Sequence, residues 1–260
     1  MKRVKKLPLT SECHHWTRLG EVPWDLQKYW QQRHTIFPYY NEGIYMTPDA
    51  WYGVTPEPVA NQIARDLGSI ISSSKTTVID LFAGVGANAI SLALATAEDG
   101  ETLRWGKVIA VELDAATLAC AQHNASLHGV ADDIIWVLGD SFKFLDTLLN
   151  SPDQLEDELR VDIASTALFA SPPWGGPGYS TDEIFDLSTM EPYNLAKLHE
   201  SYRAMDHALY LPRTSDLRQI AKLAPDGIKL DVVQYCVEGA SKAMVAYIPA
   251  TNDGDTLMKT

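Results

Sequence analysis

The sequence has few cysteines, no long apolar run and no internal repeat. Cys13, Cys120 and Cys236 stand apart without a paired spacing, which argues against a disulfide framework and favours a reducing compartment. No apolar stretch reaches the roughly 20 residues of a membrane span, and none follows the basic start "MKRVKKLPLT". We therefore expect neither a membrane anchor nor a secretory signal.

Positive charge is also scarce. The chain has 21 Lys and Arg against 34 Asp and Glu, giving a formal net charge of −13. Proteins that grip long nucleic acids do so through many basic contacts with phosphates, so this charge argues against coating a strand. A nucleic-acid substrate would instead be held over a few nucleotides, at a small basic patch.

Apolar strands alternate with helical stretches from Thr76 onward. The 260-residue chain is long enough for one good-sized domain plus an extension. Strands are expected within 76–86, 107–114, 134–140, 161–170, 209–212, 230–238 and 242–249, and helices within 87–97, 115–129, 194–208 and 215–224. This alternation predicts an α/β fold, with a mostly parallel sheet and helices on both faces.

The first third of the chain differs in composition. Residues 21–70 are rich in aromatic and basic side chains, and we expect a small, mainly helical extension there, forming a lid over the active site and partly a second layer of core. Residues 1–20 are expected to be a flexible basic tail, with a nuclear import signal as the alternative. Residues 71–260 would form the catalytic domain.

A glycine turn, "DLFAGVGAN", follows the first predicted strand. Gly84 and Gly86 allow the backbone to pass close to a ligand, with Asn88 directly after them. The turn lacks the third glycine of a dinucleotide motif, since position 89 is Ala, and it lacks the lysine of a phosphate loop. Asp80 would repel a pyrophosphate but attract a cationic amine or sulfonium.

Two further acids end the next two strands. Glu112 stands where a carboxylate accepts both hydroxyls of a ribose, although an ordinary exposed strand-end acid is the alternative. Asp140 would lie beside an adenine and accept from its amino group. Ligands of parallel sheets bind at the carboxyl ends of the strands, so these acids and the glycine turn together predict S-adenosylmethionine, which has no phosphate.

The stretch "SPPWGGPGY", residues 171–179, follows the fourth predicted strand. It is either a surface turn or a rigid wall beside a flat ligand. Two prolines remove two N–H donors, so the loop presents carbonyl oxygens. These oxygens can accept from an exocyclic amine while Trp174 stacks on the ring that carries it. Beside the predicted methyl donor, the wall is favoured, with an aromatic amine as its ligand.

The same stretch resembles the motif of amino-group methyltransferases, and its Trp-Gly-Gly-Pro form is similar to the trimethylguanosine synthase family of RNA cap guanine-N2 methyltransferases. The resemblance continues through "KYWQQRHTIFPYYNEGI", "WYGVTPEPVANQIA", "DLFAGVGANAI", "VIAVELD", "HNASLHGVADDI" and "LYLPR". Gly178 and Ala87 depart from it, at positions that are often acidic and glycine, respectively. The resemblance implies a seven-stranded Rossmann-like class I methyltransferase fold. It also implies two methyl transfers from S-adenosylmethionine to N2 of a 7-methylguanosine cap, giving a 2,2,7-trimethylguanosine cap.

The resemblance also implies roles for individual residues. Cofactor contacts would come from Asp80, Gly84, Gly86, Asn88, Glu112 and Asp140, with Thr55 nearby and Phe37 folding over the cofactor. Trp174 would stack on the methylated base, and Asn124 would face its polar edge. Lys28, Tyr179 and Arg213 would hold cap phosphates. The resemblance also implies two kinds of partner, which are capped small nuclear or nucleolar RNA and the proteins that deliver such RNA. It implies a nuclear or nucleolar location, with the cytoplasm as a second site.

The predicted chemistry is direct displacement. The guanine amine is a weak nucleophile, and we expect Ser171 or Pro172 to polarise one N–H through a carbonyl oxygen, or Ser171 to do so through its hydroxyl, with no strong general base. No metal is expected, since "ECHHW" lacks a second ligand pair. Two alternatives stay open: another amino-group methyltransferase, acting on internal RNA guanine or adenine, DNA or protein glutamine, and a non-catalytic cap- or cofactor-binding module.

Overall fold

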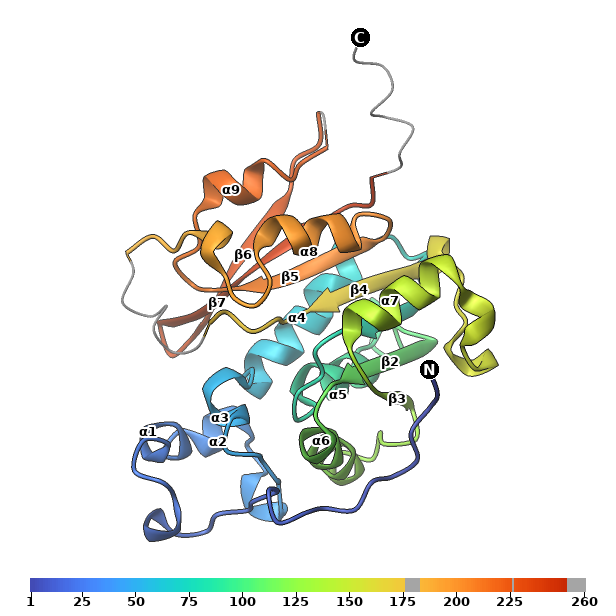
Figure 1. The fold of residues 1–260 in the computed structure, drawn as a ribbon. Helices are drawn as coiled ribbons and strands as arrows, with labels where there is room; N and C mark the ends of the chain where they lie inside the picture. Colours follow the sequence, from blue (N-terminus) through green and yellow to red (C-terminus); the bar gives the residue numbers. More distant parts are fainter. Residues whose placement is uncertain (176–182, 226, 252–260) are drawn as a thin grey trace.

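A seven-stranded sheet forms the centre of the molecule (Figure 1). The structure is a computed structural model and describes residues 1–175, 183–225 and 227–251. The strand order is β3-β2-β1-β4-β5-β7-β6. From β3 to β5 along this order, adjacent strands are parallel to one another. Strand β7 is antiparallel to both β5 and β6. The strands are β1 (Thr77–Asp80), β2 (Lys107–Glu112), β3 (Ile134–Leu138), β4 (Thr166–Ala170), β5 (Asp206–Leu211), β6 (Asp231–Val237) and β7 (Ala240–Ile248).

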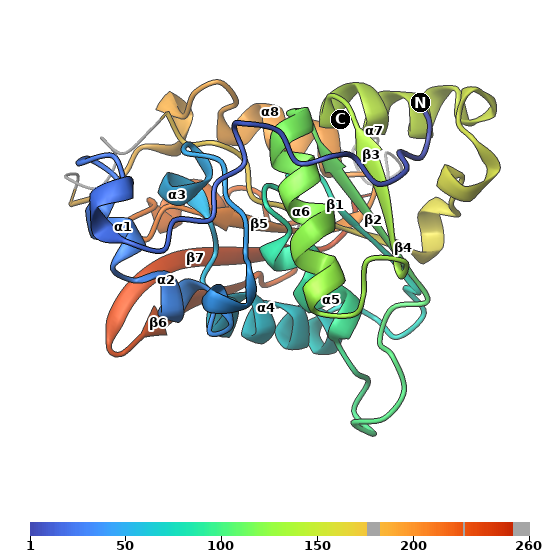
Figure 2. The ribbon, with the colours of Figure 1, turned by 90° about the horizontal axis from the view of Figure 1, so that it is seen from below.

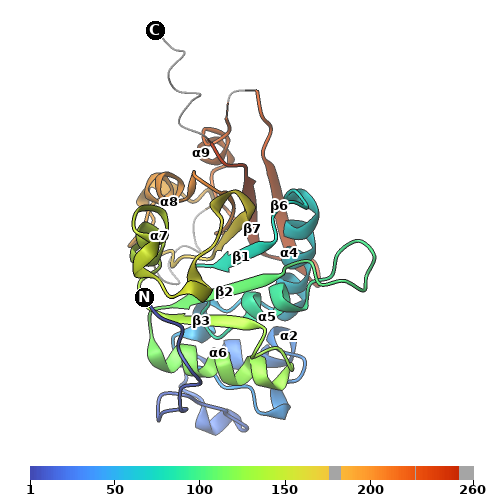
Figure 3. The same cartoon turned by 90° about the vertical axis from the view of Figure 1, so that its right-hand side faces the viewer.

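Helices cover both faces of this sheet. Figure 3 shows α4 and α5 on one side and α7 and α8 on the other. The α-helices are α1 (Gln27–Trp30), α2 (Arg33–Ile36), α3 (Ala50–Gly53), α4 (Glu57–Ile70), α5 (Ala87–Leu94), α6 (Ala115–Leu127), α7 (Ser141–Asn150), α8 (Leu195–Tyr202) and α9 (Leu217–Ala221). Short 3-10 helices are η1 (Leu19–Glu21), η2 (Tyr40–Glu42), η3 (Pro152–Gln154), η4 (Asp157–Leu159), η5 (Ile163–Ser165) and η7 (Leu187–Thr189). The fold predicted from the sequence is confirmed. No helix in the described ranges is long and apolar enough to cross a membrane.

The strands are apolar on both faces because both faces are buried. Val78 of β1 packs with α4, α5 and α6, whereas its neighbour Ile79 packs with α7 and α8. Successive side chains of a strand point to opposite faces, so each central strand contributes to both cores. This arrangement fixes the sheet and places the ends of β1 to β4 at one edge.

Residues 1–20 do not form the flexible tail expected from the sequence. Val4 donates a backbone hydrogen bond to Trp136 of β3 over 2.8 Å, and Leu7 donates to the Gln122 side chain of α6 over 2.7 Å. Figure 2 shows this segment running along α6 toward β3. The expectation is wrong because β3 is an edge strand, whose unpaired backbone groups offer partners to a neighbouring segment.

The remaining extension builds a core of its own. Trp16, Trp30, Phe37, Tyr40 and Trp51 are buried together and pack onto α5 and α6. In contrast, α4, which the sequence assigned to the extension, packs on the sheet face beside α5. Its apolar stripe follows the helical period and matches that face.

One predicted helix is too long. The stretch 194–208 was expected to be helical, but α8 ends at Tyr202 and β5 already begins at Asp206. Residues 207–211 are all buried and pair with β4 and β7. A fully buried strand shows no alternation, so its sequence alone resembles a buried helix.

Candidate active site

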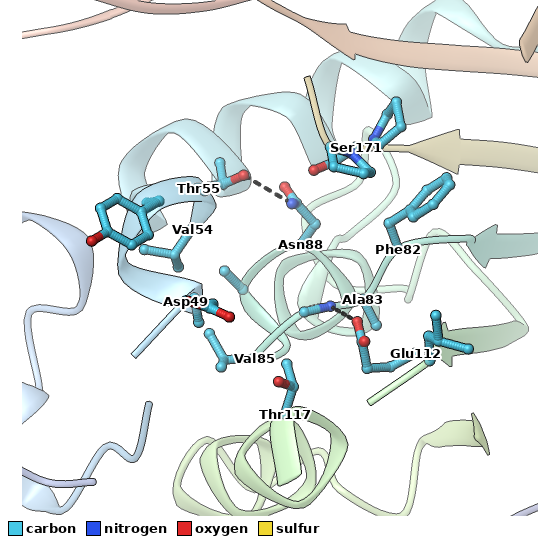
Figure 4. A pocket seen from close by; sticks show the side chains of 18 of the residues that line it. Asp49, Val54, Thr55, Phe82, Ala83, Val85, Asn88, Glu112, Thr117 and Ser171 are labelled. Carbon is cyan, nitrogen blue, oxygen red and sulfur yellow. Dashed lines mark hydrogen bonds between the residues drawn. The ribbon is translucent and has the colours of Figure 1, made fainter. Parts of the chain in front are cut away.

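A cavity of about 580 Å³ opens at the carboxyl ends of β1 to β4. Its walls come from the loops after these strands and from residues 28–55 of the extension, as Figure 4 shows for part of the lining. Nine of the residues selected from the sequence line it, namely Lys28, Thr55, Gly84, Asn88, Glu112, Asp140, Ser171, Pro172 and Trp174. Tertiary structure thus brings residues more than a hundred positions apart into one site.

Asp80 lies beneath the glycine turn rather than on the cavity surface. Its carboxyl group is fully buried, and Oδ1 accepts a hydrogen bond from the Phe82 N–H over 3.2 Å. Within the described residues Oδ2 has no partner. The pKa of Asp80 is raised to about 7, mainly by burial. The hydrogen bond from Phe82 lowers the pKa, and the charge of Glu112 contributes to the rise.

The two glycines have different surroundings. Gly84 lines the cavity with a φ of +54°, which favours glycine. Gly86 does not line it; its φ is +94°, and an added Cβ would lie 3.3 Å from Ala121 of α6. Gly86 therefore permits close packing of the turn on α6, which is a different task from the cofactor contact predicted for it.

The two strand-end acids are held by backbone donors. Glu112 accepts from the Gly84 N–H over 2.8 Å and from the Asp114 N–H over 2.9 Å. Burial raises the pKa of the Glu112 carboxyl, and these hydrogen bonds lower it. Asp140 caps α7 by accepting from the Lys143 N–H over 2.8 Å. Both acids thus face the cavity in fixed orientations.

Trp174 lines the cavity from the opposite wall. Its ring is half-buried and stacks on Tyr210 of β5, with centroids 5.6 Å apart and planes 13° from parallel. The Trp174 indole N–H donates to the backbone oxygen of Tyr210 over 3.3 Å. Tyr210 and its carbonyl therefore hold the indole in a fixed plane beside the cavity.

Two residues assigned from the sequence do not line the cavity. Phe37 is 2% exposed and belongs to the core of the extension, away from the cavity. Asn124 is fully buried, accepts from the Tyr45 N–H over 2.9 Å, and donates to the backbone oxygens of Tyr45 and Val85. Asn124 therefore joins the extension to α6, and its contact with the base stays a prediction.

The predicted phosphate contacts are only partly brought together. Lys28 is exposed at the cavity, with its Nζ 4.8 Å from the centre of the Tyr29 ring. Arg213 is exposed and does not line the cavity. Tyr179 and the departing Gly178 lie outside the described residues.

Sequence reasoning missed part of the lining. Tyr29 and Tyr52 meet edge to face, and the Tyr52 hydroxyl donates to Asp25 over 2.7 Å. Phe82 and Tyr193 add aromatic surface near the 171–174 loop. Phe82 could have been found from its place at the start of the glycine turn, two residues after Asp80. No local sequence feature marks Tyr193. Across residues 1–175, 183–225 and 227–251, no group of three or more His, Cys, Asp or Glu side chains is arranged to hold a metal ion.

Comparisons with known proteins indicate the family of this chain. A family model described as RNA cap guanine-N2 methyltransferase matches residues 75–251. The trimethylguanosine synthase of Schizosaccharomyces pombe is 32% identical over 229 residues, which cover 87% of each chain. That of Saccharomyces cerevisiae is 30% identical over 201 residues, covering 76% of this chain and 58% of the relative.

A solved structure from Porphyromonas gingivalis W83, described as a candidate methyltransferase, shares the fold with a TM-score of 0.57 and 15% identity. The match covers 90% of this chain and 52% of that one. The resemblance stated from the motifs is confirmed by the family match and by relatives of at least 30% identity over most of the chain. The chain belongs to the RNA cap guanine-N2 methyltransferase family.

Proposed function

We propose that this enzyme transfers methyl groups from S-adenosylmethionine to N2 of a 7-methylguanosine RNA cap, twice, giving a 2,2,7-trimethylguanosine cap. The observation that carries the proposal is one cavity with two unlike walls. Acids and a glycine turn line one wall, and a tryptophan with a proline loop lines the other. A methyl donor and a flat amine would then meet between them.

The acidic wall suits a cationic cofactor without phosphate. Among the described residues, one buried oxygen of Asp80 has no partner, and Glu112 and Asp140 line the cavity. We assign Glu112 to the ribose, Asp140 to the adenine amine, and the Gly84 turn to the methionine part. S-adenosylmethionine supplies an electrophilic methyl group on a positively charged sulfur when it is bound.

The opposite wall suits a positively charged purine. Methylation at N7 leaves guanine cationic, and stacking of a cation on a tryptophan contributes about 0.5–2 kcal/mol, depending on desolvation. The face of Trp174 away from Tyr210 is assigned to the base. Lys28 at the cavity is assigned to the cap phosphates.

Ser171 and Pro172 orient the amine. Their oxygens would accept an N–H of N2 and turn its lone pair toward the methyl group, so that transfer proceeds in line. No histidine is among the described residues that line the cavity, and we propose that the proton leaves to solvent. Nuclear location, with a cytoplasmic pool, and delivery of RNA by ribonucleoprotein partners belong to the same proposal.

The decisive experiment compares two dinucleotide caps. The protein is incubated with S-adenosylmethionine and either 7-methylated or unmethylated cap, and the products are weighed by mass spectrometry. Two added methyl groups on the 7-methylated cap alone are expected, with the singly methylated cap as the intermediate. Equal methylation of both caps, or of neither while internal RNA guanine is modified, would overturn the assignment.

A further inference from the structure

Asn88 has a buried amide oxygen without a partner at the cavity wall. It is the second residue of α5, is 7% exposed and lines the cavity. Its Nδ2 donates to the Thr55 hydroxyl over 3.0 Å, while Oδ1 has no hydrogen-bond partner in the described part of the chain. An unsatisfied buried acceptor lowers stability, and a bound donor would remove that loss.

Thr55 is the hydrogen-bond partner of the Asn88 amide nitrogen. The Thr55 side chain is itself buried, and it takes up the amide nitrogen of Asn88. Figure 4 shows the Asn88 amide between Thr55 and Ser171, on the side of the cavity where the proline loop begins. Oδ1 itself has less than 1 Å² of exposed surface, at a cavity wall that Asn88 shares with Thr55 and Ser171.

We propose that Asn88 Oδ1 accepts one N–H of the guanine amine while the Ser171–Pro172 loop accepts the other. This inference rests on the proposed function and moves Asn88 from the cofactor side to substrate positioning. Conjugation holds the two N–H groups near the plane of the ring, so two acceptors in that plane would engage both. With both N–H groups held, the nitrogen lone pair is directed at the methyl carbon.

The two methyl transfers then differ in their need for Asn88. In each, an N–C bond forms, the S–C bond breaks with its electron pair going to sulfur, and N2 loses one proton to solvent. Before the first transfer, N2 carries two N–H groups and uses both acceptors. Before the second, it carries one N–H and one methyl, so a single acceptor is sufficient.

The test measures both transfers separately. Single-turnover rates at saturating S-adenosylmethionine are determined on a 7-methylguanosine cap and on a 2,7-dimethylguanosine cap. In Asn88→Leu the first transfer should slow at least tenfold and the second no more than threefold. In Asn88→Asp, which has an oxygen at the same place and leaves the Thr55 hydroxyl free to donate, most of the first-transfer rate should return.

A matched control lies on the same helix. Ser91 of α5 donates to Asn61 of α4 over 2.8 Å, and neither residue lines the cavity. Asn61→Leu removes a comparable tie between helices and should leave the ratio of the two rates unchanged. Melting temperatures of all variants show whether each is folded.

Three results would overturn the proposal. Equal slowing of both transfers by Asn88→Leu would reduce Asn88 to a structural tie between Thr55 and α5. Unchanged rates at saturation with tenfold weaker S-adenosylmethionine binding, measured by calorimetry, would assign the oxygen to the cofactor ammonium. Unchanged rates and binding would remove any role. If the unaltered protein methylates neither cap, the proposed function itself fails.

Discussion

Asp80 is the most perturbed acid at the site, with a fully buried carboxyl and a pKa of about 7. A bound cation favours the ionised form, so binding of S-adenosylmethionine should tighten by up to tenfold per pH unit up to about pH 7 and level off above pH 8. Calorimetry between pH 6 and 8.5 measures this dependence. The Asp80→Asn variant should bind S-adenosylmethionine more weakly, and its affinity should not change with pH over this range. A flat profile in the unaltered protein would show that Asp80 does not sense the cofactor.

The same carboxyl group affects the stability of the ligand-free protein. The folded state holds its proton up to about pH 7, whereas an unfolded aspartate releases it near pH 3.9. Between these values the folded state binds more protons, so this group's contribution to stability falls as the pH rises. Urea unfolding at pH 5 and pH 8 should show a loss that Asp80→Asn lacks. An equal loss in the variant would assign it to other groups.

Trp174 has its indole plane fixed by Tyr210. Trp174→Phe has a smaller ring and no indole N–H, so KM for the 7-methylated cap should rise about tenfold while binding of S-adenosylmethionine changes less than twofold. Steady-state kinetics and calorimetry measure the two quantities. A normal KM in a folded Trp174→Phe variant would contradict stacking on the base.

At the scale of elements, α6 is fastened to the extension by Asn124. Its amide bonds three backbone groups, two on Tyr45 and one on Val85. Asn124→Leu leaves these buried backbone groups without hydrogen-bond partners. The free energy of unfolding should therefore fall by about 2–4 kcal/mol. Ser126→Ala, which removes one local bond within α6, is the control. If Asn124→Leu instead leaves stability unchanged and raises KM for the cap, Asn124 contacts the base as the sequence predicted.

The elements themselves were readable where their pattern is local. The glycine turn, the acids of β2 and α7 and the 171–174 loop lie at strand ends, and strand ends of a parallel sheet meet at one edge. The end of α8 and the start of β5 were misjudged, because a strand buried on both faces has no alternation to show. Sequence alone did not reveal that Phe37 and Asn124 are buried away from the cavity, because aromatic and amide side chains serve a core as well as a ligand.

For the whole molecule, charge limits how RNA is held. The net charge is −13, and only Lys28 and Arg213, among the described cations, are assigned to phosphates. Each phosphate contact on a single strand contributes about 0.7 to the slope of log affinity against log salt. Two contacts predict a slope of about −1 to −2 for capped oligonucleotides of any length. A slope steeper than about −5, or one that grows with length, would reveal an extended RNA surface.

The alternation of strands and helices, the glycine turn with its acids and the proline loop could be recognised in the sequence, because each is marked by residues close together in the chain. The folded structure revealed that Arg3 and Val4 pair with the edge strand β3, that Asn124 fastens the extension, and that Asn88 lines the cavity with a buried amide oxygen that has no partner among the described residues. These features depend on which distant backbone or side-chain groups are left to be satisfied after packing. That balance is a property of the folded chain and has no local signature.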